Sequence, residues 1–266
     1  MAPRDLISGR VLVTGATGGL GQAIARAFAA RGATLILTGR RTSVLEPLAE
    51  ELGARAIVCD LGDRDEVERL IDEMGEIDVL ATNAGVPAMG ALTDLTREQI
   101  DQLLEVNLRA QMALAQAAAI GMVARRRGHI VLMSSLAAKT TAPATSIYST
   151  TKFALRGFGL GIREDLRPYG VGVSVVMPGF ISDAGMLVEA GIELPPGIGT
   201  RTTHDVAVAV LRGIERNRAE VEVAPLKMRL GSAFANLAPE LASAASRRRG
   251  GNKVAAAAVD SDREQR

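Results

Sequence analysis

The sequence is poor in the side chains that build disulfides, metal sites and base-stacking surfaces. Its 266 residues include one cysteine, two histidines, two tyrosines, five phenylalanines and no tryptophan. One thiol cannot form an internal disulfide, and one thiol with two imidazoles cannot supply the usual zinc tetrads. So few aromatic rings do not make a stacking platform, and 31 basic residues nearly cancel 30 acidic ones. We therefore predict no metal site and no nucleic-acid partner.

A long uninterrupted hydrophobic run is also missing. The longest apolar stretch, residues 113–124, contains Gln116 and is shorter than the roughly 20 residues that cross a bilayer. The first residues show no basic segment followed by a long apolar one, so we expect neither a signal peptide nor a transmembrane segment. The single thiol fits a reducing compartment. Together these absences predict a cytoplasmic protein.

Short apolar runs alternate regularly with helical patterns along the chain. The apolar runs are almost continuous, as in strands buried on both faces, and occupy 10–14, 33–38, 54–59, 77–82, 129–134, 171–177 and 220–223. Helical patterns fill 19–31, 42–52, 63–74, 96–124, 147–168 and 204–217. This alternation predicts an α/β fold, a Rossmann-like, doubly wound and mostly parallel seven-stranded sheet with helices on both faces.

The domain organisation follows from the absence of a repeat or of a linker that would divide the core. Residues 1–245 are predicted to form a single domain. The long connection 180–203, rich in glycine and proline, is predicted to be a lid over a substrate. A helix is expected at about 226–243, followed by a disordered tail over 246–266 that contains three consecutive arginines.

A glycine-rich turn, Thr14-Gly-Ala-Thr-Gly-Gly-Leu-Gly21, joins the first predicted strand to the first predicted helix. Glycines permit a tight turn and close approach of a pyrophosphate, and the helix N-terminus adds free N–H groups and a partial positive charge. Such a turn alone also occurs without any ligand. Its position after the first strand of an alternating chain favours dinucleotide binding.

The end of the second predicted strand bears on which dinucleotide is bound. In folds that prefer NAD, a carboxylate near this place accepts hydrogen bonds from the ribose 2′-hydroxyl. Here Arg40 and Arg41 follow the strand, and guanidinium groups suit a 2′-phosphate. The alternative is that both arginines are merely solvated side chains of a loop. We predict NADP(H) in preference to NAD(H).

Tyr148 and Lys152 are four residues apart in a predicted helix, so both project from the same face. A nearby ammonium group favours the phenolate and lowers the pKa of a phenol, which is ordinarily near 10. Ser135 ends the fifth predicted strand, where doubly wound folds bind ligands. Its hydroxyl could orient a carbonyl while Tyr148 protonates the oxygen. Tyrosine and lysine at this spacing also occur by chance on helix surfaces.

Taken in order, these motifs resemble the short-chain dehydrogenase/reductase family in its compact single-domain form. The resemblance covers about residues 8–225. It includes the TGxxxGxG turn, Asp60, Asn83-Ala84-Gly85, Asn107, Ser135, Tyr148-x-x-x-Lys152 and Pro178-Gly179. Several such motifs at fitting spacing are more specific than any one of them.

The resemblance implies a role for each of these positions. Tyr148 would be the general acid/base and Ser135 would orient the carbonyl. Lys152 would tune Tyr148 and hold the nicotinamide ribose, while Asn107 would support a water relay to it. The implied cofactor-binding residues are Gly15, Thr17, Gly18, Gly19, Leu20, Gly21, Arg40, Arg41, Asp60, Leu61, Asn83, Ala84, Gly85, Tyr148, Lys152, Pro178, Gly179 and Ile181. Simpler alternatives remain for two of them, Asn107 as a solvent-exposed helix residue and Asp60 as the cap of the next helix.

Three positions depart from the family pattern. Thr82 stands where an asparagine is common, and Asp183 stands where a threonine commonly follows Pro-Gly. Ser182 could take over the contact to the carboxamide. After residues 220–223 the chain lacks the glycine-rich ending of many tetrameric members. We expect a homodimer or a homotetramer without a choice between them.

The ending contains Leu226, Leu230, Phe234, Leu237 and Leu241, a spacing that predicts an amphipathic helix. Its apolar face would pack on the body of the domain or on a second subunit. The alternatives are a flap over the substrate mouth or a membrane-surface contact near the basic residues. Among the rare side chains, His129 and His204 are predicted to be structural and Cys59 to be a buried thiol.

The sequence thus predicts an NADP(H)-dependent oxidoreductase that interconverts an alcohol and a ketone or aldehyde by hydride transfer. A dinucleotide-binding sensor or scaffold without turnover, and an epimerase or dehydratase, are the alternatives. An apolar small-molecule substrate is suggested by side chains in the predicted lid, namely Met186, Leu187, Val188, Ile192 and Leu194.

Overall fold

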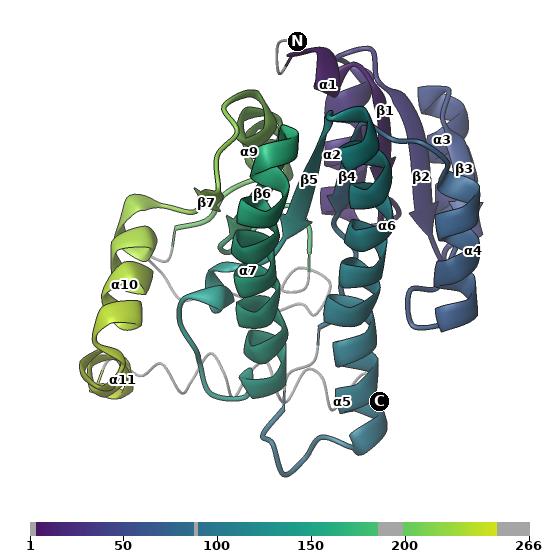
Figure 1. Ribbon diagram of the computed structural model, residues 1–266. Coiled ribbons are helices and arrows are strands. Elements are labelled where there is room, and N and C mark those ends of the chain that lie inside the picture. The colour runs from purple at the N-terminus through teal and green to yellow at the C-terminus, as the bar shows by residue number, and fades with distance from the viewer. Residues whose placement is uncertain (1–3, 88–89, 186–198, 249–266) are drawn as a thin grey trace.

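The computed structural model describes residues 4–87, 90–185 and 199–248, and its centre is a seven-stranded parallel sheet (Figure 1). The strand order is β3-β2-β1-β4-β5-β6-β7, and every pair is parallel. The strands are β1 (Arg10–Val13), β2 (Thr34–Gly39), β3 (Arg55–Val58), β4 (Val79–Thr82), β5 (Gly128–Met133), β6 (Val171–Pro178) and β7 (Glu220–Val223). The order reverses between β1 and β4, which is where doubly wound sheets bind ligands. The predicted fold class is confirmed.

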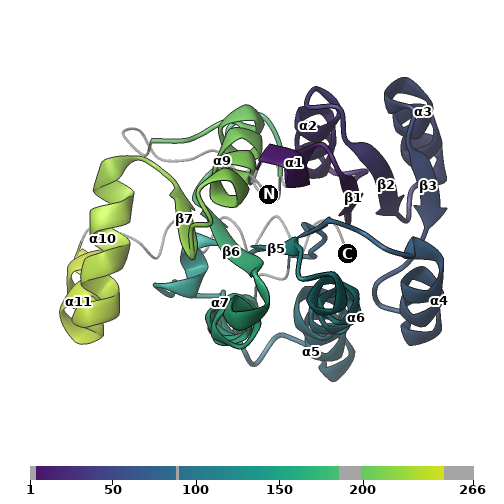
Figure 2. The ribbon, with the colours of Figure 1, turned by 45° about the horizontal axis from the view of Figure 1, so that its top comes forward.

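Helices cover both faces of the sheet (Figure 2). One face carries α2 (Gly19–Ala29), α3 (Thr42–Leu52) and α9 (Thr203–Glu215), and the other carries α4 (Arg64–Met74), α6 (Ala110–Arg125) and α7 (Ser146–Leu166). The remaining short elements are α1 (Arg4–Ile7), α5 (Arg97–Leu104), a π-helical turn (Glu105–Arg109) and two 3-10 turns (Leu136–Ala138 and Arg167–Tyr169). The predicted helix over 96–124 is therefore a straight succession of three helical segments.

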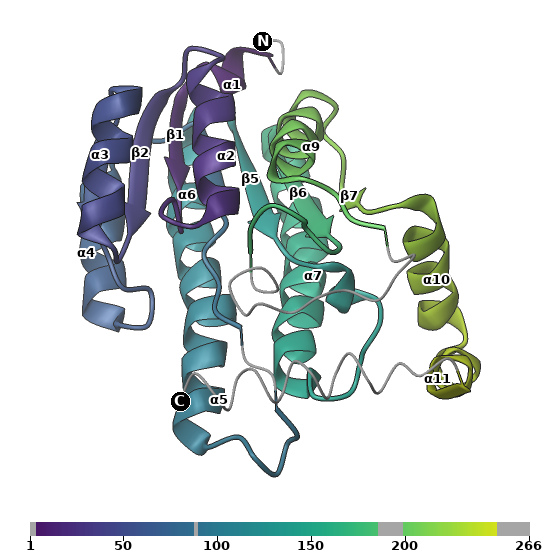
Figure 3. The same ribbon diagram turned by 180° about the vertical axis from the view of Figure 1, so that it is seen from behind.

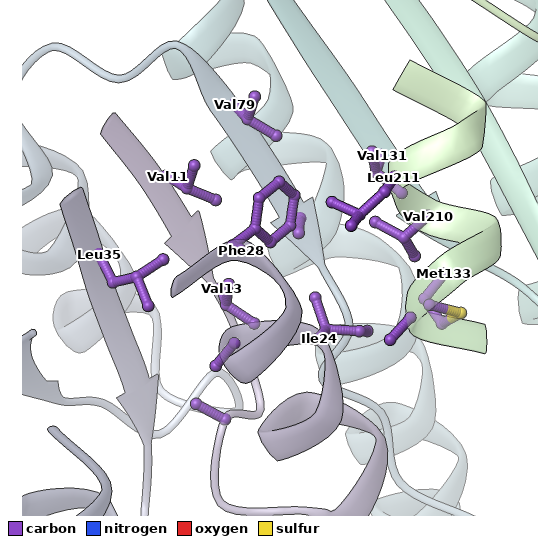
Figure 4. Packing of buried hydrophobic residues seen from close by; sticks show 14 of the residues in the cluster. Val11, Val13, Ile24, Phe28, Leu35, Val79, Val131, Met133, Val210 and Leu211 are labelled. Atoms are coloured by element: carbon purple, nitrogen blue, oxygen red, sulfur yellow. The ribbon is translucent and has the colours of Figure 1, made fainter. Parts of the chain in front are cut away.

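The core consists of one apolar layer on each side of the sheet. Under α2 and α9, Phe28 and Ile24 are fully buried against Val13 and Val131 of the sheet (Figure 4). On the opposite face, residues such as Leu80 pack against α4, α6 and α7. Because the central strands are covered on both sides, their sequences are apolar throughout rather than alternating.

Polar side chains define where several helices begin. Thr96 and Gln99 form the predicted capping box of α5. A second capping box, from Thr202 and Asp205, starts α9. Asp63 accepts hydrogen bonds from the first turn of α4, so the alternative that Asp60 caps this helix is wrong.

The carboxyl-terminal region differs from the single predicted helix at 226–243. It forms α10 (Leu226–Leu237) and α11 (Pro239–Arg248), with Ala238 in a non-helical conformation between them. The break follows from Pro239, because the residue before a proline is pushed out of the helical region. Helix α11 also extends into the predicted tail, whose residues 249–266 lie outside the described part of the chain. The apolar side chains of the predicted lid, within 186–198, lie outside it as well.

Candidate active site

The glycine-rich turn between β1 and α2 has a backbone that only glycine tolerates at one position. Gly15 has a φ of +63°, and a Cβ atom there would lie 2.7 Å from the Cα of Ala84. Helix α2 begins at Gly19; its N-cap residue, Gly18, provides no side-chain cap, and its first turn has no acidic residue. The N–H groups of such a helix end seek an anionic partner. The turn therefore fits a pyrophosphate, the group that a dinucleotide would place here.

The segment after β4 is tied to this turn. The Thr14 hydroxyl accepts hydrogen bonds from the backbone N–H groups of Asn83 and Ala84, both at 3.0 Å. In return, the Asn83 amide donates to the carbonyls of Thr14 and Gly15. The structure thus gives Asn83 a structural task beside the cofactor-binding one that the resemblance implies.

Two arginines and one carboxylate lie at the ends of β2 and β3. Arg41 donates to the carbonyl of Thr17 at 2.6 Å, and Arg40 lies 3.6 Å from the Asp60 carboxylate. Asp60 also accepts the N–H of Gly62 at 2.9 Å. Both guanidinium groups are exposed, so they are placed to meet an anion beside the glycine-rich turn.

Ser135, Tyr148 and Lys152 come together at the carboxyl end of β5. Ser135 follows this strand, and its hydroxyl accepts the N–H of Ala137 at 3.1 Å. Tyr148 and Lys152 lie on successive turns of α7, with the lysine Nζ 5.6 Å from the centre of the tyrosine ring. The ammonium group donates to the carbonyl of Met133 at 3.2 Å.

Burial shifts the pKa values of these two side chains. It raises the pKa of Tyr148, and a hydrogen bond from Ser135 opposes that rise. It lowers the pKa of Lys152 from 10.5 to about 8, because the charged form has lost its water. Lys152 therefore remains mostly protonated at neutral pH and places a positive charge beside the phenol.

Asn107 lies in the π-helical turn, where the N–H of Ala110 bonds to the carbonyl of Glu105 five residues before it. Its side chain is fully buried and binds both backbone groups of Val86, accepting from the N–H at 2.8 Å and donating to the carbonyl at 2.9 Å. The solvent-exposed alternative for Asn107 is wrong. The residue supports the loop after β4 from behind and does not line the cavity described next.

All other predicted site residues line one cavity of about 770 Å³ at the carboxyl ends of the strands. The lining contains the catalytic candidates Ser135, Tyr148 and Lys152, and the implied cofactor-binding residues Gly15, Thr17, Gly18, Gly19, Leu20, Gly21, Arg40, Arg41, Asp60, Leu61, Asn83, Ala84, Gly85, Pro178, Gly179 and Ile181. The structure thus brings together positions that are up to 166 residues apart in the chain, from Gly15 to Ile181.

The two ends of the long connection after β6, residues 181–183 and 201–203, are bonded to each other, and we call this pair of segments the neck. Ile181 forms a parallel bridge with Arg201, and the carboxylate of Asp183 accepts both the N–H and the hydroxyl of Thr203, each at 2.9 Å. Asp183 therefore joins this neck to the start of α9. Ser182 bonds to the carbonyl of Arg201 and does not line the cavity, so the structure does not support its suggested contact to the carboxamide.

Several residues that the sequence analysis missed line the site or support it from behind. Gln111 is buried and donates to the carbonyl of Ala84 at 2.9 Å, and its position four residues after Asn107 was the available signal. Helix α10 contributes Met228, Gly231 and Ser232 to the cavity lining. No sequence motif marks these three, because only the fold brings α10 to the site, where Met228 packs against a buried cluster that includes Leu136 and Met177.

A network of ion pairs connects Lys139, the edge strand β7 and helix α10. Lys139, which follows Ser135 by one turn, contacts Glu220 at 2.9 Å and Glu222 at 2.6 Å on the edge strand β7. Arg229 of α10 donates to the same Glu222 at 2.9 Å. This network connects the loop after β5, the edge of the sheet and α10.

The rare histidine and thiol side chains take the structural places that were predicted for them. His129 is buried, its Nε2 lies 2.9 Å from the Ser174 hydroxyl, and burial lowers its pKa to about 3. Cys59 is buried, and this burial raises the pKa of its thiol to about 11. Within the described residues, no group of three or more His, Cys, Asp or Glu side chains is arranged to hold a metal ion.

Comparison with known proteins agrees with this geometry. Residues 9–193 match the family described as short chain dehydrogenase. The chain belongs to the short-chain dehydrogenase/reductase family. It is therefore an oxidoreductase by family, of a kind that binds a nicotinamide dinucleotide and acts on small-molecule substrates.

Three relatives show how far the similarity extends. The Xenopus laevis protein "Dehydrogenase/reductase SDR family member 7B" is 33% identical over 255 residues, which cover 87% of this chain and 78% of the frog protein. "Ketoacyl reductase HetN" from Nostoc sp. is 35% identical, covering 80% and 77% of the two chains. A solved short-chain dehydrogenase from Sphingobium yanoikuyae in complex with NADPH has a TM-score of 0.75 and 28% identity, covering 87% and 96%.

In the part of the chain that the structure describes, no helix has both the length and the apolar character needed to cross a bilayer.

Proposed function

We propose that this protein is an NADP(H)-dependent oxidoreductase that interconverts an alcohol and a ketone or aldehyde, with Tyr148 exchanging the proton. The observation that carries the proposal is the grouping of Ser135, Tyr148 and buried Lys152 in the same cavity as the uncapped N-terminus of α2. When bound there, a nicotinamide would supply or accept the hydride. The residues of the chain would then orient the carbonyl and move the proton.

Each of the three side chains has a task that its surroundings support. Tyr148 gives its proton to the carbonyl oxygen in reduction and takes it from the alcohol in oxidation. Ser135 orients that oxygen through its hydroxyl. Burial raises the pKa of Tyr148. The charge on Lys152, 5.6 Å from the centre of the ring, would oppose that rise, because a cation near a phenol favours the phenolate.

Asn107 acts as a positioning residue in this proposal. It holds Val86 by both backbone groups. A Cβ atom at the neighbouring Gly85 would lie in tight contact with the Asn107 Oδ1, at 3.3 Å, and in van der Waals contact with the Lys152 Nζ, at 3.7 Å. The loop after β4 therefore lies close against the lysine. The water relay that the resemblance implies would start from this place.

Replacement of Tyr148 by phenylalanine tests the chemistry. We expect loss of turnover by about a thousandfold, the scale of general acid–base catalysis, with NADPH binding retained. Turnover is measured as NADPH oxidation with a panel of carbonyl compounds that includes ketones, quinones, steroids and a ketoacyl thioester. The control is Tyr169→Phe, which changes the only other tyrosine, an exposed one that does not line the cavity.

Full activity in Tyr148→Phe would exclude the proposed mechanism. NADPH binding by the unmodified protein without consumption of any carbonyl would favour the sensor or scaffold instead.

The preference for NADP(H) rests on Arg40 and Arg41, and on the absence of a carboxylate at the end of β2. A 2′-phosphate placed between them would gain charge-assisted hydrogen bonds. We expect Arg40→Ala to weaken NADPH binding about ten- to a hundredfold and NADH binding little, as titrations of cofactor fluorescence would show. Equal loss for both cofactors contradicts the assignment. Arg41→Ala tests the glycine-rich turn as well as the 2′-phosphate, because Arg41 also donates to the carbonyl of Thr17.

The class of substrate and the assembly complete the proposal. Leu136, Phe180 and Met228 give the cavity apolar walls around the catalytic candidates, which favours an apolar carbonyl compound.

Exposed Ile120 on α6 and Phe153 on α7 provide apolar surface for a homodimer or homotetramer in the cytoplasm.

A further inference from the structure

Helix α10 has two opposite faces with different surroundings. Met228, Gly231 and Ser232 face the cavity, and Ser232 is buried. The apolar residues on the other face are exposed by 49–83%, namely Leu226, Leu230, Phe234 and Leu237. Their spacing of four, four and three places them along one side of the helix. Leu241 of α11 is 65% exposed as well. We call these five side chains the apolar stripe.

The described residues leave the apolar stripe uncovered. Helices α10 and α11 pack against each other and lie beyond the edge strand β7, away from the helices that cover the sheet (Figure 3). Four large apolar side chains along one exposed side of α10, with a fifth on α11, are unusual for a surface that faces only water. Such a surface marks a binding site for another molecule or a membrane.

Charge indicates which partner this is. Residues 226–248 contain four basic residues, Lys227, Arg229, Arg247 and Arg248, and one acidic residue, Glu240. At about 100° per residue, Lys227 and Arg229 fall on opposite flanks of the stripe. Arg229 also donates to Glu222, and its side chain remains 48% exposed. An apolar face with basic flanks is the pattern of helices that lie in the interface of an anionic bilayer, where long basic side chains reach the phosphates.

A second copy of the chain fits the stripe less well. Pairing of two stripes would bring the basic flanks of both copies together, and α10 itself has no acidic residue to pair with them.

We propose that the α10–α11 pair docks on the surface of an anionic phospholipid membrane, with the apolar stripe in the boundary between head groups and acyl chains. The opposite face of α10 then forms the wall of the cavity one helix width from the lipid. The docking does not depend on turnover, so it can hold or fail independently of the proposed oxidoreductase activity.

Sedimentation of the full-length protein with vesicles tests this proposal. We expect binding to vesicles of phosphatidylcholine mixed with phosphatidylglycerol, weaker binding to phosphatidylcholine alone, and release from the mixed vesicles as salt is raised. Leu230→Glu and Phe234→Glu are each expected to reduce binding at least about tenfold, because a charge replaces a side chain that would be buried in lipid. Lys227→Glu should reduce binding to the mixed vesicles only.

The matched control is Leu92→Glu, because Leu92 is 62% exposed, as is Leu230, but lies outside α10 and α11. Circular dichroism and thermal unfolding confirm that each variant folds. Absence of binding by the unmodified protein, or equal loss in Leu92→Glu, overturns the proposal. So does light scattering that shows an oligomer dissociated by Leu230→Glu, since a second copy would then cover the stripe.

Discussion

The pKa of Lys152 measures how strongly the buried site disfavours the charged ammonium group. Its side chain is 4% exposed, and burial lowers its pKa from 10.5 to about 8. Below pH 8 the lysine is charged in both the folded and the unfolded chain, and the folded state bears the lost hydration of the ammonium group. Between pH 8 and 10.5 the folded state loses its proton first, so the unfolded chain binds more protons and stability rises with pH.

The replacement Lys152→Met keeps the length and apolar stem of the side chain and removes the charge. At about 1.4 kcal/mol for each pKa unit, the wild-type protein should gain roughly 2–3 kcal/mol in unfolding free energy relative to the variant between pH 7 and pH 10. Urea unfolding of both proteins at a series of pH values measures this difference. Titrations that the two proteins share, such as those of exposed groups, cancel in it.

Lys227→Met is the control, because it removes a lysine from the exposed side of α10. A difference between Lys152→Met and wild type that stays flat from pH 7 to pH 10 would refute the reasoning. It would mean that water or a counter-charge reaches the ammonium group in the folded protein.

Two further predictions concern stability and cofactor binding. His129→Gln should make the protein less sensitive to acid. The pKa of His129 is about 3 in the folded protein and 6.5 in the unfolded chain, so the wild-type histidine increasingly favours unfolding as pH falls below 6.5, by up to roughly 4–5 kcal/mol. Acid unfolding curves of the two proteins measure this difference. Gly15→Ala should destabilise the fold by about 2 kcal/mol or more and abolish NADPH binding, because its Cβ would overlap Ala84. The comparison is Gly53→Ala, which has a similar positive φ but open space around it and should cost only about 1 kcal/mol; equal losses in the two alanine variants would argue against the overlap.

The strands were predictable because their sequences carry the pattern that their environment demands. Residues such as Leu12 and Leu80 lie in a sheet covered on both faces, and a continuous apolar run has few other uses in a chain of this composition. The break between α10 and α11 was missed although Pro239 marks it. The periodic leucines on both sides of the proline favoured one long helix.

The residue types of the site were predictable, whereas their partners were not. The pairing of Asp183 with Thr203 depends on how the chain returns after 20 residues. The π-helical turn at Asn107 depends on packing between α5, α6 and the loop after β4. No local sequence preference predicts such a turn. The contribution of α10 to the cavity depends on an ion network around Glu222 that joins three separate segments.

The bridge between Ile181 and Arg201 and the bonds of Asp183 to Thr203 fix both ends of the connection after β6 to each other. Because the two ends are already held together, a longer or shorter connection between them changes the closure entropy only slightly, by about 0.6 kcal/mol for a doubling of its length. Insertions and recombination at this one place are expected to leave the sheet and the proton-transferring residues unchanged. The connection between Gly185 and Gly199 can therefore be exchanged as a unit in protein engineering, with Asp183 and Thr203 kept as its fixed ends.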